Sequence, residues 1–229
     1  MAPNAPLFTS FEQKARISLI YRQYAKFRTG EEVRSMSGYP IIASITQDIM
    51  ISAAVDGKVE RVILMAGNIM TLDEIVKQLR KKNKQIYVHV EMVGGIGRDA
   101  SVIEYLAEMF AIDGIVTTKS NMVVAAKQVG IKSIQRVFAI DSAAVETAIR
   151  MIQHCDPDEV ELMPGLMPRI IREFKQRIDQ PLIAGGLIRN QEEIDTAFRS
   201  GASYVSIGNP DFWNDFATGS MPKQHSSQK

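Results

Sequence analysis

The sequence contains a single cysteine, Cys155, so no disulfide can form within the chain. Such sparse cysteine usage is typical of proteins from a reducing compartment, and we expect a cytoplasmic protein. No apolar run reaches the roughly 20 residues that a membrane helix needs. The first ten residues also lack the charged and apolar regions of a secretory signal. We therefore expect no membrane partner.

An excess of one charge is also missing, since 27 Lys and Arg residues offset 26 Asp and Glu residues. A net charge of +1 gives no general attraction to nucleic acid, so an RNA partner needs a local basic patch. The three histidines are scattered, and no Cys/His cluster, P-loop or dinucleotide fingerprint is present. We predict no metal, no cofactor and no catalytic residue.

Short apolar runs rich in Val and Ile alternate with amphipathic stretches from Pro40 to Trp213. Continuous apolar runs are typical of parallel strands that are buried on both faces. The predicted strands are Ile41–Ile45, Arg61–Met65, Ile86–Glu91, Gly114–Thr118, Ser133–Phe138, Glu159–Leu162, Leu182–Ala184 and Tyr204–Ile207. Eight strands alternating with helices predict an α/β protein with a TIM-type (β/α)8 barrel, and an open doubly wound sheet is the alternative.

Two irregularities leave open an incomplete barrel. The first crossover, Gln47 to Glu60, is short, and the helix after Gly208 is stunted. Residues 1–38 carry apolar side chains at near-helical spacing, which predicts an N-terminal helical extension that would cover such a gap. We expect the barrel domain to span 39–218 and the polar tail, 219–229, to be disordered.

Several residues predict helix ends. Thr71 and Glu74 have the spacing of a capping box, and Pro168 suits a first helical turn. Gly130 and Gly201 stand where helices often end in a left-handed residue. Asp141 is either part of a site or the N-cap of a helix over 143–153.

The strongest functional signal is a pair of glycine turns after the last two predicted strands. The first contains Gly185, Gly186 and Leu187, and the second contains Gly208 and Asn209. Glycine lets backbone N–H groups approach an anion closely, and the following helix start is expected to add a favourable dipole. Paired turns at this position hold phosphate in many barrels of this kind. The alternative is that the glycines only permit tight turns.

Polar side chains end several other predicted strands and could surround the polar end of a phosphorylated polyol. These residues are His89, Glu91, Lys119, Arg136 and Glu161. His89 and Glu91 share a face by period-two alternation. Each has a plainer alternative: His89 as a satisfied interior histidine, Lys119 as a solvated residue at a helix start, and Arg136 with Glu161 as a buried ion pair.

Five stretches together resemble the glycerol-3-phosphate-responsive antiterminator proteins, the regulators of glycerol uptake operons. They are Pro40-Ile41-Ile42-Ala43, Asp113 to Asn121, Ile134 to Ser142, Val160 to Gly165 and Ile183 to Arg189. The chain differs from the family pattern at Ser44-Ile45-Thr46, at Glu91 to Gly95 and at Gly208-Asn209. Its N-terminal forty residues are longer than the family's.

The resemblance implies a TIM-type barrel, a glycerol 3-phosphate ligand, binding to leader mRNA and no catalysis. A related polyol phosphate stays open as the ligand, and a homo-oligomer stays open as the assembly. The candidate RNA surfaces are the arginines of the N-terminal segment, the stretch Lys77-Arg80-Lys81-Lys82-Lys84 and the stretch Arg169-Arg172-Lys175-Arg177. Each is also readable as a solvated helix face.

Two other functions remain open. A phosphosugar aldolase or isomerase would use Lys119 for a Schiff base. A metabolite sensor would act on a protein partner through the N-terminal segment.

Overall fold

The computed structural model describes residues 39–97 and 99–214. Its strands are β1 (Ile41–Ile45), β2 (Arg61–Leu64), β3 (Gln85–His89), β4 (Gly114–Thr117), β5 (Lys132–Phe138), β6 (Glu159–Met163), β7 (Leu182–Gly185) and β8 (Tyr204–Ile207). Its α-helices are α2 (Ile51–Asp56), α3 (Ile69–Arg80), α4 (Ser101–Phe110), α5 (Ser120–Val129), α6 (Ser142–Cys155), α7 (Pro168–Arg177) and α8 (Gln191–Arg199). Two short 3-10 helices are η1 (Asp48–Met50) and η2 (Pro210–Trp213).

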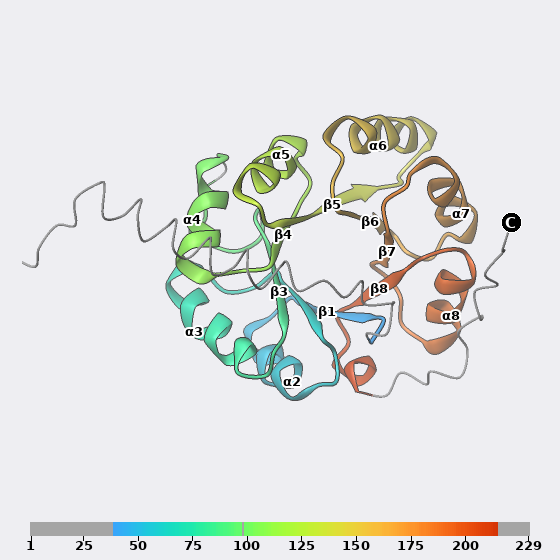
Figure 1. The fold of residues 1–229 in the computed structure, drawn as a ribbon. Coiled ribbons are helices and arrows are strands. Elements are labelled where there is room, and N and C mark those ends of the chain that lie inside the picture. Colours follow the sequence, from blue (N-terminus) through green and yellow to red (C-terminus); the bar gives the residue numbers. More distant parts are fainter. Residues whose placement is uncertain (1–38, 98, 215–229) are drawn as a thin grey trace, which may run out of the picture. The chain divides into compact units, whose positions relative to one another are not determined.

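The eight strands pair in sequence order, all parallel, and form a closed barrel with the helices outside it (Figure 1). The ring closes where β1 pairs with β8, with Ile41 opposite Val205. The predicted TIM-type (β/α)8 barrel is confirmed, and the expectation of an incomplete barrel or an open sheet is wrong. The predicted domain limits at 38 and 218, the N-terminal helix and the tail lie outside the described residues.

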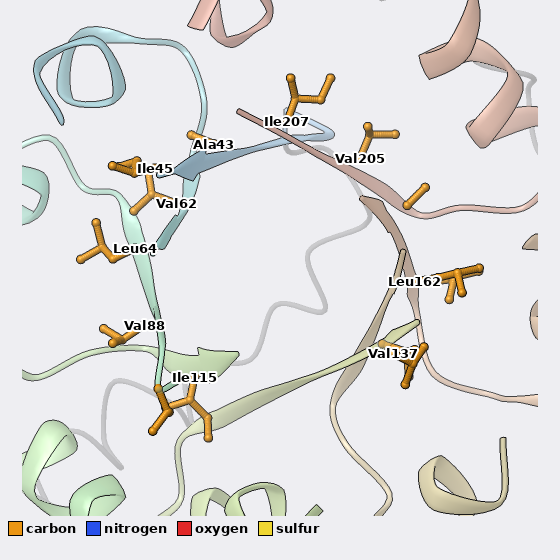
Figure 2. Packing of buried hydrophobic residues seen from close by; sticks show 14 of the residues in the cluster. Ala43, Ile45, Val62, Leu64, Val88, Ile115, Val137, Leu162, Val205 and Ile207 are labelled. Carbon is orange, nitrogen blue, oxygen red and sulfur yellow. The ribbon is translucent and has the colours of Figure 1, made fainter. Parts of the chain in front are cut away.

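Each strand buries both of its faces, which explains the continuous apolar runs. The outward side chains, among them Leu64, Ile115 and Leu162, point away from the barrel axis toward the helices (Figure 2). The inward side chains form a second cluster inside the barrel. Its members are Ile42, Ile63, Met65, Tyr87, Val116, Ile134 and Ile183. The barrel interior is therefore packed below its mouth, and a ligand can only enter from above this layer.

Helix ends follow the predictions except at α3. Asn68 caps this helix and its side chain accepts from the Met70 N–H at 2.9 Å, so the predicted start at Thr71 is wrong by three residues. Thr71 instead lies in the first turn and reaches back to Asn68. Asp141 does cap α6, accepting from Ala144 N–H at 2.7 Å, and Gly130 ends α5 in the left-handed conformation.

The predicted stunted helix after β8 is the single turn η2. The buried Trp213 at its end donates its indole N–H to the Ile207 carbonyl at 3.0 Å. This hydrogen bond holds the turn against the end of β8. In the described part of the chain, no helix combines the length and apolar character that crossing a bilayer requires.

Candidate functional site

The carboxyl ends of the strands meet at one mouth of the barrel because all eight strands are parallel. Above the apolar layer, the inward positions there are polar and buried. They are Ser44 of β1, His89 of β3, Arg136 of β5, Glu161 of β6 and Ser206 of β8. A polar layer of this kind, lying over a dry core, is the natural place for a ligand.

Glu161 is fully buried and links two other side chains of this layer. Its Oε2 accepts from Arg136 Nε at 2.7 Å, and its Oε1 accepts from the Ser206 hydroxyl at 2.6 Å. The alternative of a buried ion pair is therefore correct for Arg136 and Glu161. This ion pair occupies only one of the three guanidinium nitrogens of Arg136. The other two contact sulfur atoms: Nη1 lies 3.8 Å from Met92 Sδ and Nη2 lies 3.3 Å from Met65 Sδ. Thioether sulfur is a weak acceptor, so Arg136 keeps donors for an oxygen ligand.

His89 and Glu91 carry buried polar atoms that have no hydrogen-bond partner. The unpaired atoms are both ring nitrogens of His89 and Oε2 of Glu91. The other carboxylate oxygen of Glu91 accepts from the Thr117 hydroxyl at 2.5 Å. Since buried polar groups are almost always satisfied in folded proteins, His89 is not the satisfied interior histidine of the plainer alternative.

His89 is neutral. Burial lowers its pKa to about 3, and the nearby Arg136 charge contributes to the lowering. The 3.3 Å approach of His89 Nδ1 to Glu91 Oε2 is therefore not an ion pair, although the distance alone would suggest one. One donor and one acceptor of the imidazole remain available to a ligand.

This neutral histidine makes stability depend on pH. In the unfolded chain the histidine pKa is about 6.5. The stability that comes from keeping His89 neutral is therefore fully present above pH 6.5, and it is lost as the pH falls toward the pKa of His89 in the folded chain. From neutral pH to about pH 5, the free energy of unfolding should fall more steeply than in a His89→Gln chain, by up to about 1.4 kcal/mol per pH unit. Urea titrations at several pH values measure the difference. His154→Gln is the control because His154 is exposed, and parallel curves for the wild-type and His89→Gln chains would contradict the assignment.

Gly185 ends β7 and faces the same polar layer. It pairs with Ser206 of β8, and a Cβ added to it would collide with the Ser206 hydroxyl and lie 2.9 Å from Glu161 Oε1. Only glycine fits here. The next two residues are both left-handed, with φ of +76° at Gly186 and +65° at Leu187. A non-glycine residue in this conformation costs about 1 kcal/mol or more, and such strain concentrates at functional sites.

The second glycine turn lies beside the first, because β7 and β8 are paired neighbours. Gly208 has ordinary space around it, with the nearest atom to an added Cβ being Ser44 O at 3.6 Å. The side chain of Asn209 caps η2 by accepting from Asp211 N–H at 3.1 Å. The backbone N–H groups of Gly186, Leu187 and Gly208 donate to no other described residue. They are free to bind an anion at the mouth.

The helix after the first turn does not contribute as expected. The side chain of Asn190 accepts from Glu193 N–H at 3.0 Å, and Glu193 accepts from Arg189 N–H at 2.6 Å. The first turn of α8 also contains Glu192. Its N-terminus is thus capped and carries negative side chains, which weaken the attraction of the helix dipole for phosphate at this turn.

Lys119 lies at the mouth between these groups and the outer helices. It is half-buried at the N-cap of α5, and its backbone N–H donates to the Thr117 hydroxyl at 3.1 Å. Its ammonium pairs with no described residue. A cleft of about 440 Å³ beside Arg136 is lined by Thr118, Phe138 and the apolar face of α6. The mouth therefore holds an unpaired ammonium on Lys119 and a partly satisfied guanidinium on Arg136.

The two described candidate RNA stretches are not rows of free cations. Lys84 is buried and donates to the carbonyls of Gly57 at 2.5 Å and Val59 at 2.7 Å, so its inclusion in a basic surface is wrong. Arg80 pairs with Asp113 at 2.8 Å. In the second stretch Arg177 is held by Glu146 at 2.5 Å. The arginines of the N-terminal segment lie outside the described residues.

Sequence reasoning missed Ser44 and the link from Ser206 to Glu161. The available signal was period-two alternation: Ser44 follows Ile42, and Ser206 follows Tyr204, on the inward face of each strand. A small polar residue at the last inward position of an apolar strand would have indicated them.

Comparisons with known proteins identify one family for this chain. Residues 41–213 match the family model described as glycerol-3-phosphate responsive antiterminator. A protein of Escherichia coli K12, the uncharacterized YgcP, is 32% identical over 174 residues, which cover 76% of this chain and 91% of that protein.

Two crystal structures resemble the barrel. The glycerol uptake operon antiterminator regulatory protein of Listeria monocytogenes is 30% identical, with a TM-score of 0.74, over 80% of this chain and 98% of that one. A glycerol uptake operon antiterminator-related protein of Thermotoga maritima is 29% identical, with a TM-score of 0.68, over 77% and 98%.

Proposed function

The chain belongs to the glycerol-3-phosphate responsive antiterminator family, and from this premise we propose that it senses glycerol 3-phosphate at the barrel mouth and binds leader mRNA of glycerol utilisation genes. It acts as a regulator in the cytoplasm, without catalysis and without a cofactor. One observation carries the ligand assignment: the buried, unpaired polar atoms of His89 and Glu91 beside the Arg136 guanidinium.

The polar end of the ligand satisfies these atoms. Glu91 Oε2 accepts from one hydroxyl of the glycerol moiety, and neutral His89 offers one donor and one acceptor to a neighbouring hydroxyl. Arg136 exchanges its weak sulfur contacts for ligand oxygen, while Glu161 holds it in place. Leaving such groups unpaired costs free energy, so a ligand that pairs them gains affinity and selectivity.

The phosphate end rests on backbone amides of the two glycine turns. Gly186, Leu187 and Gly208 supply free N–H groups, and Asn209 lies beside them. The first turn of α8 is acidic, so Lys119, at the start of α5, is a candidate to balance the phosphate charge from the β4 side. Ligand binding orders these turns, and RNA affinity changes only as far as the ligand prefers the RNA-competent state.

The aldolase or isomerase alternative has less support. Lys119 has an unpaired ammonium, but no neighbouring carboxylate or histidine among the described residues contacts it as a general base would. Trapping of an imine on Lys119 with borohydride and a triose phosphate would favour this alternative over the proposed regulator.

The test is a titration of the full chain with leader RNA in the presence and absence of glycerol 3-phosphate. We expect the ligand to tighten RNA binding by about 5- to 150-fold, the usual range of such coupling. The same ligand should raise the melting temperature, because it binds the native state only.

Glycerol and inorganic phosphate are the matched controls, since each keeps one half of the ligand. Other polyol phosphates test the ligand class. A melting temperature that no polyol phosphate shifts would contradict the sensor site, whereas a shift without any change in RNA affinity would contradict the RNA role alone.

A further inference from the structure

The mouth of the barrel is ringed by exposed apolar side chains. Of the ten large apolar residues that are exposed in the described part of the chain, seven lie at the carboxyl end of a strand or on the segment between that end and the first turn of the next helix. These seven, here called the apolar rim, are Ile49, Met70, Met92, Phe138, Ile140, Leu166 and Leu187. The most exposed are Met70 at 87%, Ile140 at 83% and Ile49 at 82%. The other three residues lie on α4 and α5, on the side of the barrel.

Topology places the whole rim on one face. Because all strands are parallel, the loops after β1, β2, β3, β5, β6 and β7 emerge at the same end of the barrel (Figure 1). Each of these loops, or the helical turn that directly follows it, contributes at least one rim residue. Single exposed apolar residues need no explanation, but a set gathered around a ligand site marks an interaction surface.

The chemistry of this face favours a protein over RNA. Its only rim aromatic is Phe138, whereas single strands are bound by several aromatic platforms and by unpaired cations. Charges of both signs surround the rim. They are Asp48, Asp99, Asp141, Glu192 and Asp211 on the acidic side and Lys119, Arg169 and Arg189 on the basic side. A face that carries both signs repels a polyanion in part, whereas it can pair its basic residues with acidic residues of a second copy.

The exposed area suits an interface between two such chains. A standard interface takes about 800 Å² from each partner, of which somewhat more than half is apolar. Large aromatic side chains bury roughly 150–250 Å² each. The four most exposed rim residues are somewhat smaller aliphatic side chains that are 61–87% exposed, so together they present on the order of 500 Å². The rim therefore supplies the apolar part of one standard interface.

We propose that the apolar rim is the interface of a homodimer in which two copies of this chain meet with their barrel mouths facing each other. The interface is isologous, so each copy contributes the same patch. It places the ligand site of each chain at the centre of the contact. This inference does not depend on which ligand the mouth binds.

Sedimentation velocity of the full chain over a range of concentrations tests the proposal. We expect a concentration-dependent dimer. Ile140→Asp and Met70→Glu should each weaken association by at least about tenfold, since a buried charge at a central contact is costly. Met109→Asp is the matched control, because Met109 is 61% exposed but lies on α4 away from the mouth. Circular dichroism checks that all three variants fold.

A wild-type chain that is monomeric at every soluble concentration overturns the proposal, whatever the variants do. Rim variants that associate like the wild type also overturn it, because another surface then holds the dimer. If the wild type is monomeric and Ile140→Asp loses leader RNA binding, the rim belongs to RNA instead.

Discussion

A Gly186→Asp chain is expected to lose glycerol 3-phosphate binding by at least about a hundredfold. The position has room, since an added Cβ would meet only the Met163 side chain at 3.7 Å. A carboxylate placed there adds a negative charge within one of the two glycine turns proposed to bind the phosphate. Like charges about 4 Å apart near a protein surface repel by roughly 4 kcal/mol, which outweighs the binding contribution of any single amide. Calorimetry with glycerol 3-phosphate measures the loss.

Gly186→Asn is the matched control because it has the same shape without the charge. Asparagine also accepts the left-handed backbone, where φ is +76°. We expect the Asn variant to bind within about tenfold of the wild type, and both variants to melt at similar temperatures. Equal losses in Asp and Asn variants would mean that backbone strain, and not phosphate charge, explains the effect. Unchanged affinity in the Asp variant would remove the phosphate from these turns.

The barrel could be predicted from the sequence because each strand is a continuous apolar run between polar helices. Because each strand is buried on both faces, every βα unit shows this pattern, and all eight strands were predicted to within two residues at either end. Helix starts are less certain. Asn68 caps α3 three residues before the Thr71 that the sequence pattern indicated, because both residues can accept from a helix N-terminus and only the backbone path decides between them.

The candidate site was predictable where alternation determines it. His89, Arg136 and Glu161 do lie inward at the barrel mouth, as period two requires. The pairing among them was not predictable, since Ser206 and Glu161 meet across 45 positions of sequence. The charge run that ends in Lys84 misled for a related reason. Its ammonium is buried and donates to the carbonyls of Gly57 and Val59, which lie more than twenty residues earlier in the chain. The residues next to Lys84 in the sequence give no sign of these contacts.

The ion pair inside the mouth should make Glu161→Ala the most destabilising single change in the site. Arg136 is only 5% exposed, and without Glu161 its charge would remain buried with two sulfur atoms as its remaining contacts. Breaking a buried pair from one side costs about 3–5 kcal/mol. Ser206 would also lose its acceptor. Urea unfolding measures the difference, and Glu146→Ala, which breaks the exposed pair with Arg177, should change stability little.

The double variant Arg136→Met, Glu161→Leu separates stability from function. Replacing both partners with apolar side chains removes the unpaired charge, so most of the lost stability should return. Ligand binding should not return, because the guanidinium that faces Met65 and Met92 is gone. A double variant that folds and still binds glycerol 3-phosphate with wild-type affinity would show that the pair only supports the barrel. A folded double variant without binding would mean that a buried charge is retained at this mouth for the ligand, at the expense of a more stable apolar packing.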